Sequence, residues 1–319
     1  MLQGVLAGLA AGALWGLVFV LPAWLPTWPP LDLAVGRMGA YAGVSFGALV
    51  FAQLHQLRVR HRQRTGADPD HTGDPPERLW PNLRQALAAF FLSLLGFWGY
   101  YALLVFSLRD AGPEVPTLII GTIPLWVMVL GKPGHLRWRT LLPGLLLTAA
   151  GLGLMTDAVQ GAQGLGQAPA FWRGVALATV AMVSWTAFSL LNAAWLQRSP
   201  QVSATAWTNW LGLATGVGAL CLWAAAGSPL REIASRPELF TYLWLCGLTG
   251  FGAAWVATIF WNQASRLLSA SLCGQLIVSE TLFALLYSFA LEGRWPSLAQ
   301  GLAALLFTLG ILASIRAQR

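Results

Sequence analysis

The strongest constraint on the fold is that the apolar residues are grouped into long blocks separated by polar connections. Each block is long enough to cross the hydrocarbon core of a bilayer, which takes about 20 helical residues. The blocks lie near residues 4–25, 33–54, 83–106, 113–130, 138–156, 171–194, 203–226, 238–260, 268–290 and 297–315. Because a bilayer interior offers no water to backbone polar groups, such blocks fold as helices. The sequence therefore predicts an all-α membrane protein with ten transmembrane helices.

The distribution of basic residues predicts how these helices are oriented. Charged residues make up only 10% of the chain, whereas a soluble domain averages roughly a quarter. If the N-terminus is cytoplasmic, the outward connections hold only Arg109, Arg173, Arg231, Arg236 and Arg294 of the 19 Lys and Arg residues. This bias follows the positive-inside rule. We therefore expect a multi-pass plasma (bacterial inner) membrane protein with both termini in the cytoplasm and no nucleic-acid partner.

Landmark residues recur at constant spacing in the two halves of the chain. A Gly precedes a Trp by 11 residues twice, at Gly4 and Trp15 and at Gly174 and Trp185. One offset of 157 residues relates three later pairs: Arg109 with Arg266, Gly144 with Gly301, and Gly153 with Gly310. Five helices per half is an odd number, so the second half enters the membrane from the opposite side. We expect two inverted five-helix repeats, over 1–158 and 159–319.

Small residues and histidines each allow two interpretations. Glycines four residues apart suit close helix packing, or sliding of helices during a transport cycle; they are Gly4, Gly8, Gly12 and Gly16, then Gly39, Gly43 and Gly47, then Gly212 and Gly216. The polar stretch 55–81 is expected to be a mobile cytoplasmic loop. Its histidines, His55, His61 and His71, are either solvated or metal ligands, and their irregular spacing favours solvation, so no metal or cofactor is expected.

Glu280 is the most informative candidate residue. It falls in the middle of the ninth block, where a charged side chain costs about 2.5–3.5 kcal/mol even on insertion scales. Ionisable residues at this depth are functional candidates by default. The hypothesis is a site for proton coupling or for a substrate ammonium group. The alternative is a protonated Glu that bonds to a neighbouring helix and only stabilises the bundle.

Two further charged residues lie near the outer ends of helices. Glu114 stands between Pro113 and Pro116. It either helps to open a cavity near a weakened helix start or simply complements the helix dipole. Arg37 lies about 6 Å beyond the start of the second predicted helix. It either snorkels to the outer interface, pairs with Asp32, or binds a substrate carboxylate.

Aromatic and amide side chains align across the two halves and suggest a binding site for an amphipathic small molecule. The candidates for substrate contact are Trp15, Tyr101, Trp185, Asn262 and Glu280. The alternative for any single Trp is an anchor at the membrane interface. The stretch 43–47 matches the G-x-S-x-G hydrolase pattern, but it lies inside a transmembrane block and not in the strand–turn–helix context that a nucleophile needs. No P-loop motif is present, so the chain is not expected to be an ATP-driven pump. An enzyme is not expected either, because no acid, base and nucleophile residues cluster near one interface in the sequence pattern.

Short motifs in both halves resemble the drug/metabolite transporter superfamily, in particular its ten-helix EamA-type branch. They are Ala13-Leu14-Trp15-Gly16, Arg37, Ile123-Pro124-Leu125, Ser279-Glu280-Thr281, Leu291-Glu292-Gly293-Arg294, Gly301 and Gly310. The sequence departs from the family at Thr281, where Pro is usual, and at 131–134, which lacks the usual acidic residue. Pro113-Glu114-Val115 resembles the start of the fourth helix of aromatic amino-acid exporters.

The resemblance implies a secondary transporter that works by alternating access and exports a small metabolite such as an amino acid. The partners are then the substrate, the lipid bilayer and possible coupling protons, with Glu280, Glu114 and Arg37 as coupling or gating candidates. Drug or cation efflux is the first alternative. A non-transporting scaffold and a lipid-modifying enzyme are the others.

Overall fold

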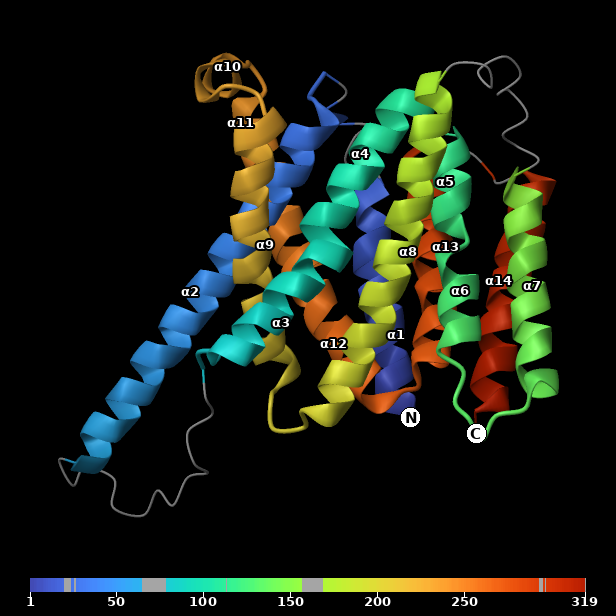
Figure 1. Cartoon of the computed structure of the whole chain (residues 1–319), viewed down its shortest axis with the longest axis horizontal. Helices are drawn as coiled ribbons and strands as arrows, with labels where there is room; N and C mark the ends of the chain where they lie inside the picture. The colour runs from blue at the N-terminus through green and yellow to red at the C-terminus, as the bar shows by residue number, and fades with distance from the viewer. Residues whose placement is uncertain are drawn as a thin grey trace.

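The computed structural model describes residues 1–19, 24–25, 27–64, 79–112, 114–156, 169–292, 295 and 297–318. All regular secondary structure within these residues is helical. Long helices stand side by side, and both chain termini lie at one end of the bundle (Figure 1). We refer to this end as the termini end and to the other as the far end.

The helices alternate in direction between the two ends of the bundle. The N-terminal part contains α1 (Leu2–Gly16), the 3-10 turn η1 (Leu17–Phe19), α2 (Pro30–Arg64), α3 (Leu83–Ser93), the π-helical segment η3 (Leu94–Trp98), α4 (Gly99–Ala111), α5 (Glu114–Gly121), α6 (Ile123–Leu130) and α7 (Trp138–Thr156). The C-terminal part contains α8 (Pro169–Arg198), α9 (Ala204–Ala226), α10 (Leu230–Ser235), α11 (Leu239–Thr249), the π-helical segment η5 (Gly250–Val256), α12 (Ala257–Leu267), α13 (Ala270–Glu292) and α14 (Leu298–Ala317).

Seven helical segments are long and apolar enough to cross a membrane. They are α2, the run α3–η3–α4, α8, α9, the run α11–η5–α12, α13 and α14. Three further apolar stretches are helical but shorter, at Leu2–Gly16, Val115–Leu130 and Trp138–Leu154. The chain is therefore a multi-span α-helical protein, and each apolar block of the sequence contains helix within its described residues.

The second helix is longer than the apolar pattern indicates. The predicted loop begins at residue 55, but α2 continues to Arg64. This part of the prediction was wrong because residues 55–64 are rich in Arg and Gln, which favour helix even where no apolar face is required. The rest of the expected loop up to residue 78, including His71, lies outside the described residues. No group of three or more potential metal ligands gathers in the part that is described.

The fourth apolar block is interrupted between α5 and α6. Pro124 stands at the start of α6 and has no N–H to donate back to the preceding turn. Thr122 bridges the interruption, since its Oγ1 donates to the Ile119 carbonyl at 2.7 Å. A single proline therefore explains why one block becomes two short helices.

Helices that are distant in the sequence pack against each other. The largest contacts join α7 to α14, α2 to α9, and α4 to α8. The first helix, α1, packs on both α12 and α13, and α6 also packs on α13. The two parts of the chain are therefore interleaved into one bundle.

The glycine face of α1 explains how closely α1 approaches α13. A Cβ added at Gly8 would lie 2.6 Å from Cδ1 of Leu276, and one added at Gly16 would lie 2.9 Å from the backbone nitrogen of Ala284. At Gly8 the Leu276 side chain would have to shift, and at Gly16 the backbone of α13 leaves no room for a side chain. Close packing, one of the two interpretations of this glycine face, is confirmed for α1.

The glycine stripe of α2 is different. A Cβ added at any of its three glycines would meet nothing within 4 Å; they are Gly39, Gly43 and Gly47. Instead α2 uses Tyr41, Ala42 and Ser45 to contact α9, where Gly212 and Gly216 leave room for them. The contact between α2 and α9 is therefore made by the glycines of α9 and not by those of α2.

Candidate functional site

Three tryptophans from three helices meet inside the bundle. Trp15 of α1 lies 6.4 Å from Trp185 of α8 and 5.3 Å from Trp261 of α12, measured between ring centroids. Trp185 and Trp261 are 6.2 Å apart. The rings are tilted or edge-on, as aromatic groups prefer. The structure thus brings together the two predicted tryptophans, and it adds Trp261, which is only 1% exposed.

A cationic side chain stacks on an aromatic ring nearer the far end. The guanidinium carbon of Arg37 in α2 lies 4.5 Å from the ring centroid of Tyr101 in α4. Tyr101 in turn meets Tyr100 edge-on at 5.3 Å between ring centroids. Cations are attracted to the faces of aromatic rings, most strongly where water is excluded. Arg37 is therefore held over Tyr101 inside the bundle.

Glu280 occupies the middle of α13 and is partly exposed. The Glu280 carboxylate and the Arg37 guanidinium carry opposite charges and attract each other at a distance. Gly12 of α1 permits a close crossing here, because a Cβ at that position would lie 3.1 Å from the Glu280 backbone nitrogen. Glu280 therefore lies where α13 crosses α1 closely.

Asn262, the predicted amide contact, lies in a buried hydrogen-bond network and is 0% exposed. Asn192 Nδ2 donates to Asn262 Oδ1, and Asn262 Nδ2 donates to Thr208 Oγ1, both at 2.9 Å. Trp207 Nε1 donates to Asn192 Oδ1 at 2.7 Å. The network joins α8, α9 and α12, and both polar atoms of the Asn262 side chain are engaged in it.

We refer to the aromatic and charged residues described above as the interior cluster; they are Trp15, Trp185, Trp261, Arg37, Tyr100, Tyr101 and Glu280. Other predicted residues lie apart from it. Glu114 is the first residue of α5, and its side chain lies outside the described part of the chain. Asp32, considered as a partner for Arg37, is 1% exposed and is engaged elsewhere. Its carboxylate accepts hydrogen bonds from Ser228 N at 3.0 Å and Ser228 Oγ at 2.6 Å.

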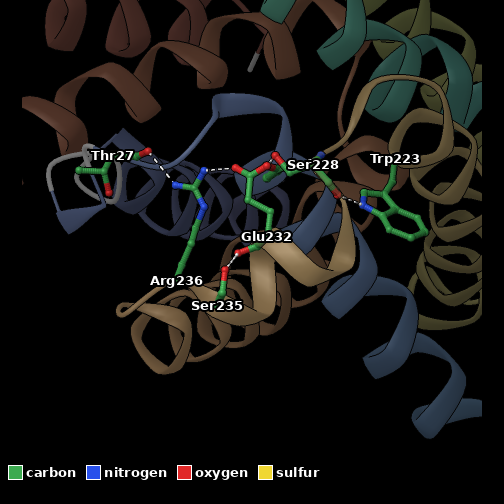
Figure 2. A network of polar contacts seen from close by, with 7 residues as sticks. Thr27, Trp223, Ser228, Glu232, Ser235 and Arg236 are labelled. Atoms are coloured by element: carbon green, nitrogen blue, oxygen red, sulfur yellow. Dashed lines mark hydrogen bonds and ion pairs between the residues drawn. The ribbon is translucent and has the colours of Figure 1, made fainter.

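Ser228 belongs to a polar network at the far end of the bundle (Figure 2). Arg236 donates from Nη2 to Glu232 Oε1 at 2.7 Å and from Nη1 to the Thr27 carbonyl at 3.1 Å. Trp223 Nε1 donates to the Ser228 carbonyl at 2.9 Å. These contacts fasten the short helix α10 to the start of α2, and they stabilise the far end without taking part in the interior cluster.

The interior cluster was only partly accessible from the sequence. Arg37, Tyr101 and Glu280 were singled out for their type and depth, and the structure brings them near one another. Trp261 and Tyr100 were not selected. Each lies next to a residue that was selected, Trp261 beside Asn262 and Tyr100 beside Tyr101. The sequence does not show which rings meet, because that depends on how α1 and α8 pack. Together the residues present one cation, one carboxyl group and several aromatic faces, a combination suited to a small molecule that carries both charge and apolar surface.

Comparisons with known proteins agree with this architecture. No protein-family model matches the chain. The inner membrane protein YtfF of Escherichia coli (strain K12) is 30% identical to it over 298 residues, which cover 88% of this chain and 86% of that protein. A solved crystal structure matches with a TM-score of 0.72 over 99% of this chain and 98% of that chain, at 21% identity, and this likeness concerns the fold alone.

The helical bundle and its apolar spans define a multi-pass membrane protein. The identity and coverage then give its relationship: the chain belongs to the family of the E. coli inner membrane protein YtfF. Its location in the inner membrane, expected from the sequence, agrees with that relative.

Proposed function

We propose that the chain is a secondary transporter of the EamA-type branch of the drug/metabolite transporter superfamily, and that it exports a small metabolite such as an amino acid by alternating access. The observation that carries the proposal is that the helices place a cation, Arg37 on the ring of Tyr101, and a carboxyl group, Glu280 in the middle of α13, within one bundle. Charges at this depth are costly, and membrane proteins retain them chiefly along substrate or ion pathways.

The arrangement is complementary to a zwitterion. Arg37 offers a guanidinium to a carboxylate, a geometry that arginine favours. Glu280 offers a carboxyl group to an ammonium, and the rings of Tyr101 and Trp15 offer apolar faces to a side chain. When the site is empty, Glu280 can instead take up a proton, which would couple export to a proton gradient.

The packing of the helices supports two inverted five-helix halves. Helices that lie five apolar blocks apart correspond to each other in the two halves, so α1 corresponds to α8 and α12 corresponds to α4. The contact between α1 and α12 has its counterpart in the contact between α8 and α4. Likewise α13 corresponds to α6, and the contact between α1 and α13 has its counterpart in the contact between α8 and α6. A Cβ at Gly4 would meet Leu268, and one at Gly174 would meet Ala111. The two glycines are 170 residues apart, and their two neighbours are 157 residues apart, which are the offsets found in the sequence.

The two π-helical segments give independent support. Leu94–Trp98 interrupts the third block and Gly250–Val256 interrupts the eighth. Trp98 and Trp255 stand 157 residues apart within them. Such segments are rare and occur frequently at functional sites, so their matched placement favours a repeat over coincidence. In the proposal the two halves rock about the interior cluster during transport.

Cysteine labelling tests the topology. In a variant whose native Cys221, Cys246 and Cys273 are replaced, a single cysteine is introduced at Gly134, Gln201 or Glu238, all of which are exposed. Ten crossings with cytoplasmic termini place 134 and 201 inside and 238 outside. An impermeant maleimide should label the first two only in inverted vesicles and the third only in right-side-out vesicles. Labelling of 134 and 201 from opposite sides would contradict the inverted repeat.

Transport is tested with purified protein in liposomes. Radiolabelled amino acids and related zwitterions should exchange across the membrane, with faster flux under a pH gradient. Glu280→Gln should abolish the pH dependence or the flux itself, whereas the matched change at an exposed far-end position, Glu238→Gln, should leave both intact. A scaffold would tolerate Glu280→Gln, and a lipid-modifying enzyme would yield a changed lipid instead of flux.

Efflux of organic cations is the second candidate, because the three tryptophans resemble an aromatic cage for cations. Arg37→Gln separates the two functions. For a zwitterion the change removes the partner of the carboxylate and weakens binding. For an organic cation it removes a repulsive charge and strengthens binding.

A further inference from the structure

A cavity opens at the termini end of the bundle, separate from the interior cluster. It has a volume of about 490 Å³ and is formed by the connection between α6 and α7, the end of α8, and the junction of α12 and α13. Its polar lining includes His135, Gln197 and Arg266. Gln197 Nε2 is bound to the carbonyls of Ser265 and Leu268 at 2.9 and 3.0 Å, which fixes one wall of the cavity.

An apolar groove of about 340 Å³ adjoins this cavity. It lies between α6 and α8 and is lined by Trp126, Leu130, Met182, Val183, Thr186, Ala187 and Leu190. Leu190 also lines the cavity, so the two spaces share a wall. Trp126, Leu130 and Val183 are 45%, 61% and 52% exposed, so the groove is open on the outside of the bundle, where a membrane protein meets lipid.

The length of the combined site matches one leaflet. From Met182 to Gln197 the groove and cavity follow one face of α8, about 22 Å at the rise of an α-helix. Half of a hydrocarbon core is about 15 Å thick. The site therefore reaches from the middle of the bilayer to the head-group layer, with its apolar part deep and its polar part at the surface.

The charge at this end is uniformly positive in the described chain. Arg266 donates only to the neutral carbonyls of Val202 and Pro200, each at 2.9 Å, so its charge is not cancelled by these partners. Lys132, beside the cavity, likewise donates to the carbonyls of Pro133 and Leu136. Among the described residues, the acidic ones lie at the far-end termini of their helices, in α10, or in the middle of α13.

We propose that an anionic phospholipid binds here, with one acyl chain in the groove between α6 and α8 and its phosphate in the cavity beside His135 and Arg266. Basic pockets between membrane helices on the cytoplasmic side attract anionic head groups. The apolar groove favours a phospholipid over a soluble anion, because only the lipid has an acyl chain that can occupy it. This proposal does not depend on the transport function.

Thermal unfolding in a neutral detergent tests the site. Phosphatidylglycerol should raise the unfolding midpoint more than phosphatidylcholine with the same acyl chains. Glycerol 3-phosphate should have little effect, because it lacks the chain that fills the groove. An equal response to the two lipids would contradict the proposal and indicate non-specific annular lipid. A response to glycerol 3-phosphate as large as that to phosphatidylglycerol would also contradict it and indicate a site for a free anion.

Variants separate the two parts of the site. Ala187→Trp fills the groove and should abolish the preference for phosphatidylglycerol, whereas Val180→Trp, exposed on the same helix but outside the groove, should retain it. His135→Glu should raise the half-saturating lipid fraction about fivefold, the effect of one charge near an anionic surface. Arg84→Glu reverses an exposed charge at the same end and should change it less.

Native mass spectrometry keeps the proposal testable if a variant does not fold. The unmodified protein, released from mixed micelles with equal amounts of both lipids, should retain phosphatidylglycerol preferentially and at a fixed number per chain. Retention of the two lipids in equal amounts would overturn the proposal.

Discussion

The guanidinium carbon of Arg37 lies 4.5 Å from the centre of the Tyr101 ring, so a residue near the start of α2 is oriented by a residue of α4. Tyr101→Phe keeps the aromatic face and should leave substrate affinity almost unchanged. Tyr101→Leu removes the face and should weaken binding by roughly twofold to thirtyfold, the range for a cation–π contact of about 0.5–2 kcal/mol. Affinity is measured by scintillation proximity with the purified protein. Equal losses in both variants would point to the Tyr101 hydroxyl instead of its ring.

Close packing of α1 on α13 predicts a strong difference between two glycine substitutions. Gly16→Ala places a methyl group 2.9 Å from a backbone nitrogen that cannot move aside, and should destabilise the protein by about 1–3 kcal/mol. Gly43→Ala faces open space and should be neutral or stabilising by about 0.5–1 kcal/mol. Thermal unfolding in detergent compares the two. Similar midpoints would mean that α1 does not pack as described.

Two buried tryptophans differ in what their indole N–H groups donate to. Trp207 donates to Asn192, whereas Trp261 Nε1 has no acceptor within the described residues. Trp207→Phe should therefore cost about 1–3 kcal/mol of stability, because it leaves a buried acceptor unpaired. Trp261→Phe should cost less stability but should raise the substrate Kd by roughly threefold to tenfold if the substrate supplies the missing acceptor. Unfolding midpoints and binding isotherms measured on the same samples separate the two effects.

The contact between Asp32 and Ser228 should stabilise the far end of the bundle. Ser228→Ala removes a 2.6 Å hydrogen bond to a carboxylate that is 1% exposed, and should cost about 1.5–3 kcal/mol. Ser235→Ala removes an exposed hydrogen bond to the Glu232 carbonyl and should change stability by less than about 0.5 kcal/mol. Calorimetry or urea unfolding measures both. A Ser228→Ala protein as stable as Ser235→Ala would show that the far-end network is dispensable.

The long apolar blocks predicted the helices correctly because membrane insertion requires a continuous run of apolar residues, a strong and local signal. The extent of α2 beyond residue 54 was missed because it depends on helix propensity in water, where no apolar pattern is needed. The division of the fourth block into α5 and α6 was not predicted, although Pro124 indicates a break in the helix at that point.

The candidate site depended on information of a different kind. Depth and charge were enough to select Glu280 and Arg37, because ionisable groups within membrane spans are rare, whereas Tyr101 was selected as an aromatic side chain. Trp261 could not be separated from the other tryptophans, since its role follows from which helices pack together. Asn262 was expected at the site, and the structure places both of its polar atoms in a hydrogen-bond network.

The π-helical segment before α4 has a consequence for the orientation of its aromatic side chains. A wider turn holds one residue more than an α-helical turn, and each residue advances the direction of a side chain by about 100°. Tyr100 and Tyr101 follow Gly99, the first residue after this segment. If residues 94–98 formed regular α-helical turns without any change in their number, the ring of Tyr101 would be rotated by about 100° away from Arg37, and that arginine would lose its aromatic partner.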